Sequence, residues 1–183
     1  MQDGLETKFA RLGEDLAVSE GSVIEGYASI FGLTDQGGDV VEAGAYAASL
    51  AALAASGRRV KMLWQHDPAQ PIGVWDEVRE DGKGLYVRGR ILSEVAQGRD
   101  AAALLAAGAI DGLSIGYRTV KSERDGKGRR RLVELDLWEV SLVTFPMLPD
   151  ARVGAKAEAH EAAGLMRDIV AAFDAASAAL TRG

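Results

Sequence analysis

Short alternating stretches punctuated by glycine run from about residue 7 to residue 150, and this pattern restricts the chain to a sheet-rich fold. Apolar and polar residues alternate in these stretches as they do in half-buried strands. Loops and turns separate them, including a glycine-rich loop at 35–39, a turn at Pro68 and Pro71, and a hairpin turn at 80–84. The pattern predicts strands at 22–31, 60–66, 72–79, 84–92, 110–121 and 131–145.

Two alanine-rich segments interrupt the strands and are predicted to be helices. The first covers 45–55 and stops before Gly57, and the second covers 94–107 and is closed by Gly108. Alanine favours helices, and glycine directly after a helical pattern is a common stop signal. With many strands and few helices, the predicted fold class is α+β and β-rich.

A further helix is predicted at 157–180, near the C-terminus. Its apolar stripe repeats at helical spacing and consists of Leu165, Ile169, Phe173, Ala176 and Leu180. Residues 1–152 are therefore expected to form one strand-rich domain, and 153–183 a linker and an amphipathic helix. The apolar stripe of the helix either packs back on the domain or contacts another protein.

Composition excludes several classes of function. A length of 183 residues suits one domain with a hydrophobic core, and the net charge of −6 argues against a general nucleic-acid binder. The absence of cysteine excludes disulfides, thiolate metal sites and a cysteine nucleophile. The N-terminal residues lack the features of a signal peptide, and no apolar stretch is long enough for a membrane span. We expect a soluble intracellular protein that uses no metal or organic cofactor.

His66 is the candidate general base, because the chain has two histidines and the other, His160, lies in the predicted C-terminal helix. An alternating strand runs into His66 and is stopped directly by Asp67 and Pro68. An imidazole can accept and release a proton near neutral pH. The alternative is a histidine at the end of a strand that serves only to bond the backbone.

Ser114 is the candidate nucleophile. The strand period places it on the same face as Gly112 and Gly116, while the apolar residues between them point into the predicted core. Two flanking glycines would leave open space above the serine, where a substrate backbone could approach. The alternative is that these glycines mark a bulge or a close strand crossing and that the serine is ordinary.

Glu139 is the candidate acid that would orient the histidine. The same alternation places it on an apolar stripe with Val133, Leu135, Leu137 and Val143. A carboxylate on such a stripe is costly to bury without a partner, and an imidazole N–H is a suitable one. The alternatives are that this part of the strand faces water, or that Glu139 pairs with a basic neighbour such as Arg118.

These residues stand in segments that resemble the prohead proteases of tailed phages, which are distant relatives of the herpesvirus assemblins. The resemblance covers roughly residues 7 to 152 and has the family's order and spacing. The segments that carry it are Glu25-Gly-Tyr-Ala-Ser-Ile-Phe-Gly32, Leu63-Trp-Gln-His-Asp-Pro68 with Pro71-Ile-Gly-Val-Trp75, Gly108-Ala-Ile-Asp-Gly-Leu-Ser-Ile-Gly-Tyr117 and Trp138-Glu-Val-Ser-Leu-Val-Thr-Phe-Pro146.

The resemblance implies a serine endopeptidase with His66, Ser114 and Glu139 as its catalytic residues. It also implies a small closed β-barrel surrounded by helices, often dimeric. The implied substrate is the scaffolding segment of the major capsid protein, and the protease itself, cut inside assembling proheads in a bacterial host. A phage, a defective prophage and a gene transfer agent are all compatible origins.

Two rival functions stay open on the same residues. One is a catalytically silent protein that binds the scaffold or aids capsid assembly on the same fold. The other is a hydrolase of small esters, which would need a deep pocket.

Overall fold

The computed structural model describes residues 6–10, 17–19 and 23–145, which form nine strands and two helices. The predicted linker and C-terminal helix at 153–183, with His160, lie outside the described residues. The boundary between the two predicted parts of the chain therefore stays a prediction.

The strands form one nine-stranded sheet in the order β1-β8-β9-β5-β6-β7-β3-β2, with β4 added beside β9. Neighbouring strands are antiparallel, except that β4 and β5 both run parallel to β9. The bounds are β1 Glu6–Ala10, β2 Ala17–Ser19, β3 Val23–Ile30, β4 Asp39–Val41, β5 Lys61–Trp64, β6 Asp67–Glu80, β7 Gly84–Ile91, β8 Gly112–Arg124 and β9 Arg130–Val143.

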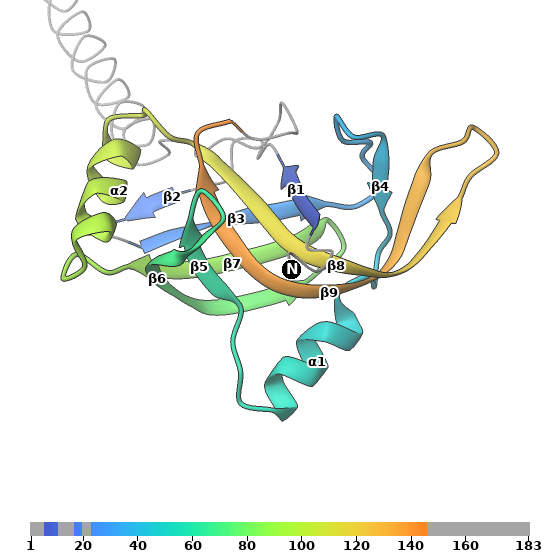
Figure 1. The fold of residues 1–183 in the computed structure, drawn as a ribbon, viewed down its shortest axis with the longest axis horizontal. Helices are drawn as coiled ribbons and strands as arrows, with labels where there is room; N and C mark the ends of the chain where they lie inside the picture. Colours follow the sequence, from blue (N-terminus) through green and yellow to red (C-terminus); the bar gives the residue numbers. More distant parts are fainter. Residues whose placement is uncertain (1–5, 11–16, 20–22, 146–183) are drawn as a thin grey trace, which may run out of the picture.

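The sheet curls strongly, so that β3 comes into contact with β1 and β8 across its concave side (Figure 1). The α+β, β-rich class is confirmed. The strand pairings among the described residues form a path with β1 and β2 at its two ends, which makes a curled, half-barrel sheet. Full closure into a barrel stays a prediction.

The two predicted helices are present within one or two residues of their expected bounds. Helix α1, Ala47–Ala55, packs against β9, and α2, Ala96–Ala106, packs against β6 and β7. Gly57 and Gly108 follow the helices with φ of 66° and 67°, a left-handed conformation that ends helices and suits glycine. Neither described helix is long and apolar enough to cross a membrane.

Three strands were not predicted, and each is short. β4 lies at the end of the predicted glycine-rich loop, where Asp39 pairs in register with Arg130 of β9. β1 and β2 have five and three residues, which is too few for alternation to identify a strand. β1 matters for the site, because its backbone lies in register beside residues 113–117 of β8.

The hydrophobic core fills the concave side of the curled sheet. Large side chains that are completely or almost completely buried come from β3, β6, β7, β8 and β9, among them Ile24, Ile72, Leu85, Ile115 and Leu135. Trp75 is also buried, and its indole N–H donates to the carbonyl oxygen of Val140 at 3.2 Å. This core fixes the relative positions of β5, β8 and β9, the strands that surround the candidate site.

Candidate active site

His66 lies in the tight turn between β5 and β6. Trp64 pairs with Asp67, so Gln65 and His66 form a two-residue hairpin loop. Both have positive φ, 51° and 63°, as in a type I′ turn. The predicted turn at Pro68 and Pro71 is therefore wrong: the chain reverses earlier, and both prolines belong to β6. The register shift between β5 and β6 leaves Pro68 in a bulge, where a missing backbone N–H is tolerated.

Left-handed backbone in non-glycine residues costs about 1–3 kcal/mol per residue, so the surrounding structure must hold this turn. The backbone N–H of Gln65 donates to the Leu142 carbonyl at 3.0 Å, and its side-chain amide donates to the Thr144 hydroxyl at 2.7 Å. The backbone N–H of His66 donates to Ser141 Oγ at 3.2 Å. Three hydrogen bonds, two to the end of β9 and one to Thr144 directly after it, thus hold the turn that carries the histidine.

Ser114 lies on β8 directly opposite Ser141 of β9 and is completely buried. The prediction of open space above it is wrong, because the flanking glycine makes room for a carboxylate. A Cβ atom at Gly116 would lie 2.1 Å from Glu139 Oε1. Gly116 therefore allows Glu139 to lie across the same face as the serine.

A bulge in β9 explains how Glu139 reaches that face. Tyr117 of β8 pairs with Leu137 while Gly116 pairs with Glu139, which leaves Trp138 as an extra residue. Since directly opposed residues share a face, Leu137 points into the core and Glu139 points to the side of Ser114. The prediction that Glu139 shares the apolar stripe of Leu137 is therefore wrong.

The alternative partner for Glu139 is engaged elsewhere. Arg118 forms an ion pair with Asp136 at 3.3 Å, with more than a third of each side chain exposed. Glu139 is instead 4% exposed and bonds to the histidine and to a serine.

The three predicted site residues form one continuous hydrogen-bonded chain. Ser114 Oγ lies 2.6 Å from His66 Nε2, and His66 Nδ1 lies 2.5 Å from Glu139 Oε1. An ionised carboxylate can only accept, so Nδ1 carries the ring proton and Nε2 is left to accept the serine proton. The histidine side chain is 15% exposed and the glutamate side chain 5%. Such an arrangement can activate a hydroxyl as a nucleophile.

Ser141 completes this cluster and was missed by sequence reasoning. Its hydroxyl donates to Glu139 Oε2 at 2.5 Å and accepts the backbone N–H of His66. The available signal was its position two residues after Glu139, which places both side chains on one face of a strand. Among the described residues, no group of three or more histidine, aspartate or glutamate side chains is arranged to hold a metal ion.

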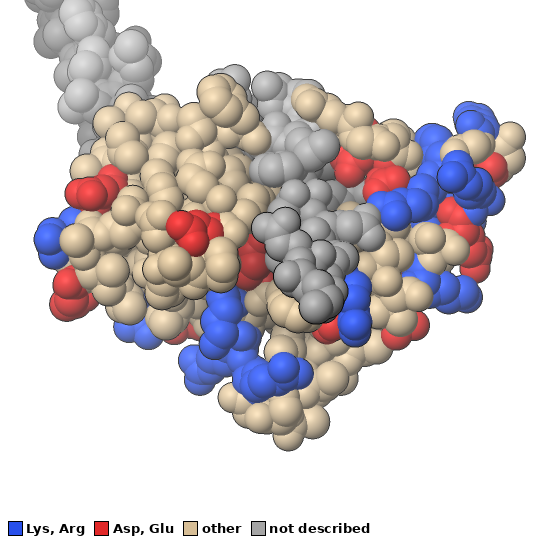
Figure 2. Space-filling model, in the orientation of Figure 1, with Lys and Arg blue, Asp and Glu red and all other residues tan. Residues whose placement is uncertain are grey.

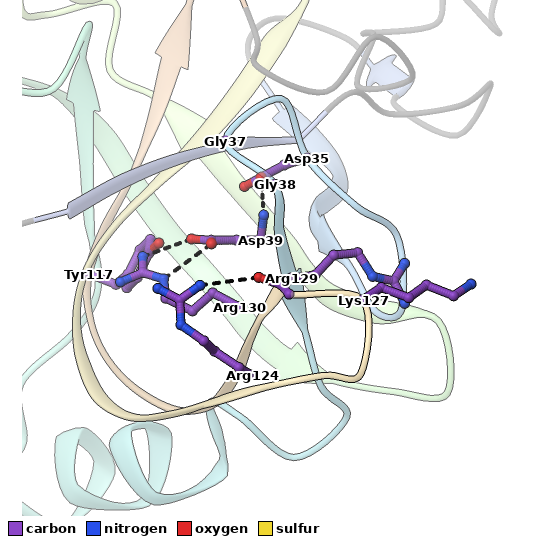
Figure 3. Close-up of a pocket in the computed structure, with 10 residues that line it drawn as sticks. Asp35, Gly37, Gly38, Asp39, Tyr117, Arg124, Lys127, Arg129 and Arg130 are labelled. Atoms are coloured by element: carbon purple, nitrogen blue, oxygen red, sulfur yellow. Dashed lines mark hydrogen bonds and ion pairs between the residues drawn. The ribbon is translucent and has the colours of Figure 1, made fainter.

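A separate polar pocket of about 670 Å³ lies beside the turn of the β8–β9 hairpin and the 35–39 loop, and none of the candidate site residues lines it (Figure 3). Figure 2 shows lysine and arginine side chains gathered at the end of the molecule where Figure 1 places this hairpin. Many of these charges are paired internally: Arg130 binds both carboxylate oxygens of Asp39 through Nε and Nη2, and Arg129 binds Asp125 at 2.7 Å. The Arg130–Asp39 pair ties the hairpin to β4, and the Arg129–Asp125 pair lies within the hairpin turn.

Comparisons with known proteins agree with this geometry. The prohead protease of Enterobacteria phage HK97 is 34% identical over 156 residues, which cover 84% of this chain and 65% of the HK97 protein. The chain thus spans just under two thirds of the length of that curated relative. The structure of the bacteriophage T4 capsid assembly protease, gp21, matches with a TM-score of 0.63 over 76% of this chain and 97% of the T4 chain. At 15% identity that match shows a shared fold.

The family model described as caudovirus prohead serine protease matches residues 11–165, which include all the residues of the candidate site. The chain belongs to the caudovirus prohead serine protease family.

Proposed function

We propose that the protein is a serine endopeptidase in which Ser114 is the nucleophile, His66 the general base and Glu139 the residue that orients and stabilises the imidazolium. The observation that carries this proposal is the continuous chain of hydrogen bonds from serine to histidine to glutamate, at 2.6 and 2.5 Å. Membership of a serine protease family supports the reaction type.

The proposed reaction is acyl transfer from a peptide bond. His66 Nε2 takes the proton of Ser114 Oγ as the oxygen attacks the scissile carbonyl carbon. The imidazolium then protonates the leaving amine, and the C–N bond breaks. Water, deprotonated by the same nitrogen, attacks the acyl-enzyme and releases the carboxylate product and the free serine. Glu139 accepts the Nδ1–H hydrogen bond throughout and stabilises the positive ring.

Burial of the nucleophile adds a step before the chemistry. Ser114 has no exposed surface, and we infer that the surrounding chain opens when a scissile carbonyl reaches its oxygen. A substrate that drives this opening contributes binding energy to it, as in enzymes whose sites are completed by conformational change. We therefore expect short peptides to be poorer substrates than a folded protein partner that docks over a wider surface.

The substrate we propose is the scaffolding segment of the major capsid protein, with cleavage of the protease itself as a second reaction. The relatives are named as a prohead protease and a capsid assembly protease, and this supports a role in capsid maturation. We propose that the reaction takes place inside assembling proheads. A homodimer and a fully closed barrel complete the proposal.

Co-expression with the cognate capsid protein tests this function. Wild-type protein should shorten the capsid protein, and mass spectrometry would give the position of the cut. Ser114→Ala should leave the capsid protein at full length. Ser122→Ala, which alters an exposed serine of the same strand, should still shorten it. Full-length capsid protein in particles assembled with the wild-type enzyme would contradict the protease and favour a silent assembly factor.

A further inference from the structure

We propose that Ser141 is a positioning residue of this active site, one that fixes both the acid and the backbone of the base. The inference rests on the proposed function and deepens it. Ser141 is completely buried and lies opposite Ser114 in the β8–β9 register. Its hydroxyl bonds both to the Glu139 carboxylate and to the backbone N–H of His66.

The first bond orients the carboxylate. Glu139 Oε1 accepts from His66, and Oε2 accepts from the Ser141 hydroxyl at 2.5 Å. With both oxygens engaged, rotation of the carboxylate about its last single bond is blocked. Without the hydroxyl, Oε2 would be a buried charged oxygen that lacks this donor. Turning toward another donor or toward water would then lower the free energy of the carboxylate.

The second bond supports the strained turn. His66 has a φ of 63°, and its backbone N–H donates to Ser141 Oγ at 3.2 Å. One oxygen atom therefore joins the histidine backbone to the glutamate side chain. Any shift of the turn relative to β9 changes the bond from the His66 N–H to Ser141 and the bond from His66 Nδ1 to Glu139, so Ser141 helps to hold the ring at a fixed position relative to the carboxylate.

The direction of the Ser141 hydroxyl separates its role from that of the nucleophile. Its proton points to Glu139, while the Ser114 hydroxyl faces His66 Nε2 at 2.6 Å. Ser114 therefore attacks the substrate, and Ser141 acts through Glu139 and His66.

Ser49 offers a matched control for removing this hydroxyl. It is also buried, accepts a backbone N–H of β9 from Leu137 at 2.9 Å, and donates to the carboxylate of Asp136 at 3.5 Å. Alanine at either position removes a buried hydroxyl that joins a backbone N–H to a carboxylate. The two variants differ in whether that carboxylate belongs to the active site.

Kinetics on a peptide or capsid fragment that spans the mapped cleavage site form the first readout. Ser141→Ala should lower kcat by about 10- to 100-fold with little change in KM, as expected for the loss of a hydrogen bond to a charged group. Ser49→Ala should keep kcat close to the wild-type value. Ser141→Thr, which retains the hydroxyl, should recover part of the loss. Equal kcat for wild type and a folded Ser141→Ala would overturn the proposal.

A double-mutant comparison checks that Ser141 acts through Glu139. In a Glu139→Gln background, Ser141→Ala should lower kcat by a much smaller factor than it does alone, because the group that Ser141 orients has lost its charge. Full additivity of the two effects would contradict this route.

The ring proton on His66 Nδ1 gives a readout that does not require activity. In proton NMR, wild type and Ser49→Ala should show this proton protected from exchange with water. Ser141→Ala should exchange faster or lose the signal. A His160→Gln variant assigns it, since the chain has two histidines. An unchanged signal in Ser141→Ala overturns the positioning role, whereas absent cleavage by wild type with the NMR difference intact would refute the proposed function alone.

Discussion

Gly116→Ala should disable the site although none of the proposed catalytic residues is substituted. The added Cβ would lie 2.1 Å from Glu139 Oε1 and 2.8 Å from Cδ, far inside van der Waals contact. The carboxylate must therefore move by about 1 Å or more to reach an ordinary contact distance. Its bond to His66 Nδ1, now 2.5 Å, then opens beyond the range of a hydrogen bond.

The expected loss can be worked out from this displacement. A charged hydrogen bond contributes about 2 kcal/mol. Moving the carboxylate charge from about 4 Å to about 5.5 Å from the imidazolium removes about 1 kcal/mol at an effective dielectric constant of about 20. The sum of about 3 kcal/mol corresponds to a kcat about a hundredfold lower. Glu139→Gln loses the whole attraction of about 4 kcal/mol, or about a thousandfold.

Steady-state cleavage of the mapped capsid fragment tests this prediction: kcat should be highest for wild type, lower for Gly116→Ala and lowest for Glu139→Gln. Thermal unfolding establishes that each variant is folded. Gly126→Ala is the control, because a Cβ there meets nothing within 4 Å. If folded Gly116→Ala keeps kcat within about threefold of wild type, then contact with Gly116 does not hold the carboxylate in place and the reasoning fails.

Two further predictions concern stability. Gly84→Ala should lower the free energy of unfolding by about 3 kcal/mol, because its Cβ would lie 2.0 Å from the backbone oxygen of Ser29. Gly82 has open space around it, so Gly82→Ala should change the free energy of unfolding by less than about 0.5 kcal/mol. Denaturant titrations measure both values. Burial raises the pKa of the Asp81 carboxyl, but hydrogen bonds from Tyr27 and two backbone N–H groups outweigh it and bring the pKa to about 2. This value is below that of an unfolded aspartate, so the carboxylate stabilises the fold above about pH 4 and loses this effect toward pH 2. Asp81→Asn should flatten that fall in unfolding free energy by up to about 2 kcal/mol, and an unchanged pH profile would contradict the assignment.

The strands and helices of the central part of the chain could be predicted because their patterns are long. β8 and β9 have thirteen and fourteen residues, and α1 and α2 end at glycines as expected. The β5–β6 turn could not be predicted, because Gln65-His66 is not one of the Asn-Gly, Asp-Gly or Gly-Gly pairs that mark a type I′ turn, while Pro68 and Pro71 imitate a turn signal. Tertiary hydrogen bonds from β9 impose that conformation on Gln65 and His66.

The candidate site residues could be identified by type and segment, whereas their surroundings could not. Trp138 is an extra residue in β9, and it reverses which face of the sheet the following side chains occupy. The sequence does not reveal this bulge, because Leu137 before it and Val140 after it are both apolar. The only signal for Ser141 was its position two residues after Glu139, since serine in a strand is ordinary. Its role depends on β5 lying parallel to β9, a pairing between segments more than seventy residues apart.

That long-range pairing sets when activity can arise as the protein is made. His66 and Glu139 are separated by 73 positions, and the histidine turn is held by residues that follow Glu139. A growing chain that has reached residue 138 contains the nucleophile and the imidazole but neither the carboxylate nor the hydrogen bonds that fix the turn. Non-local pairings of this kind form late in folding, after the entropy of closing the loop has been overcome. If the protein acts as proposed, nascent and partly folded copies are therefore inert, and the proposed cleavage activity arises only with the finished sheet.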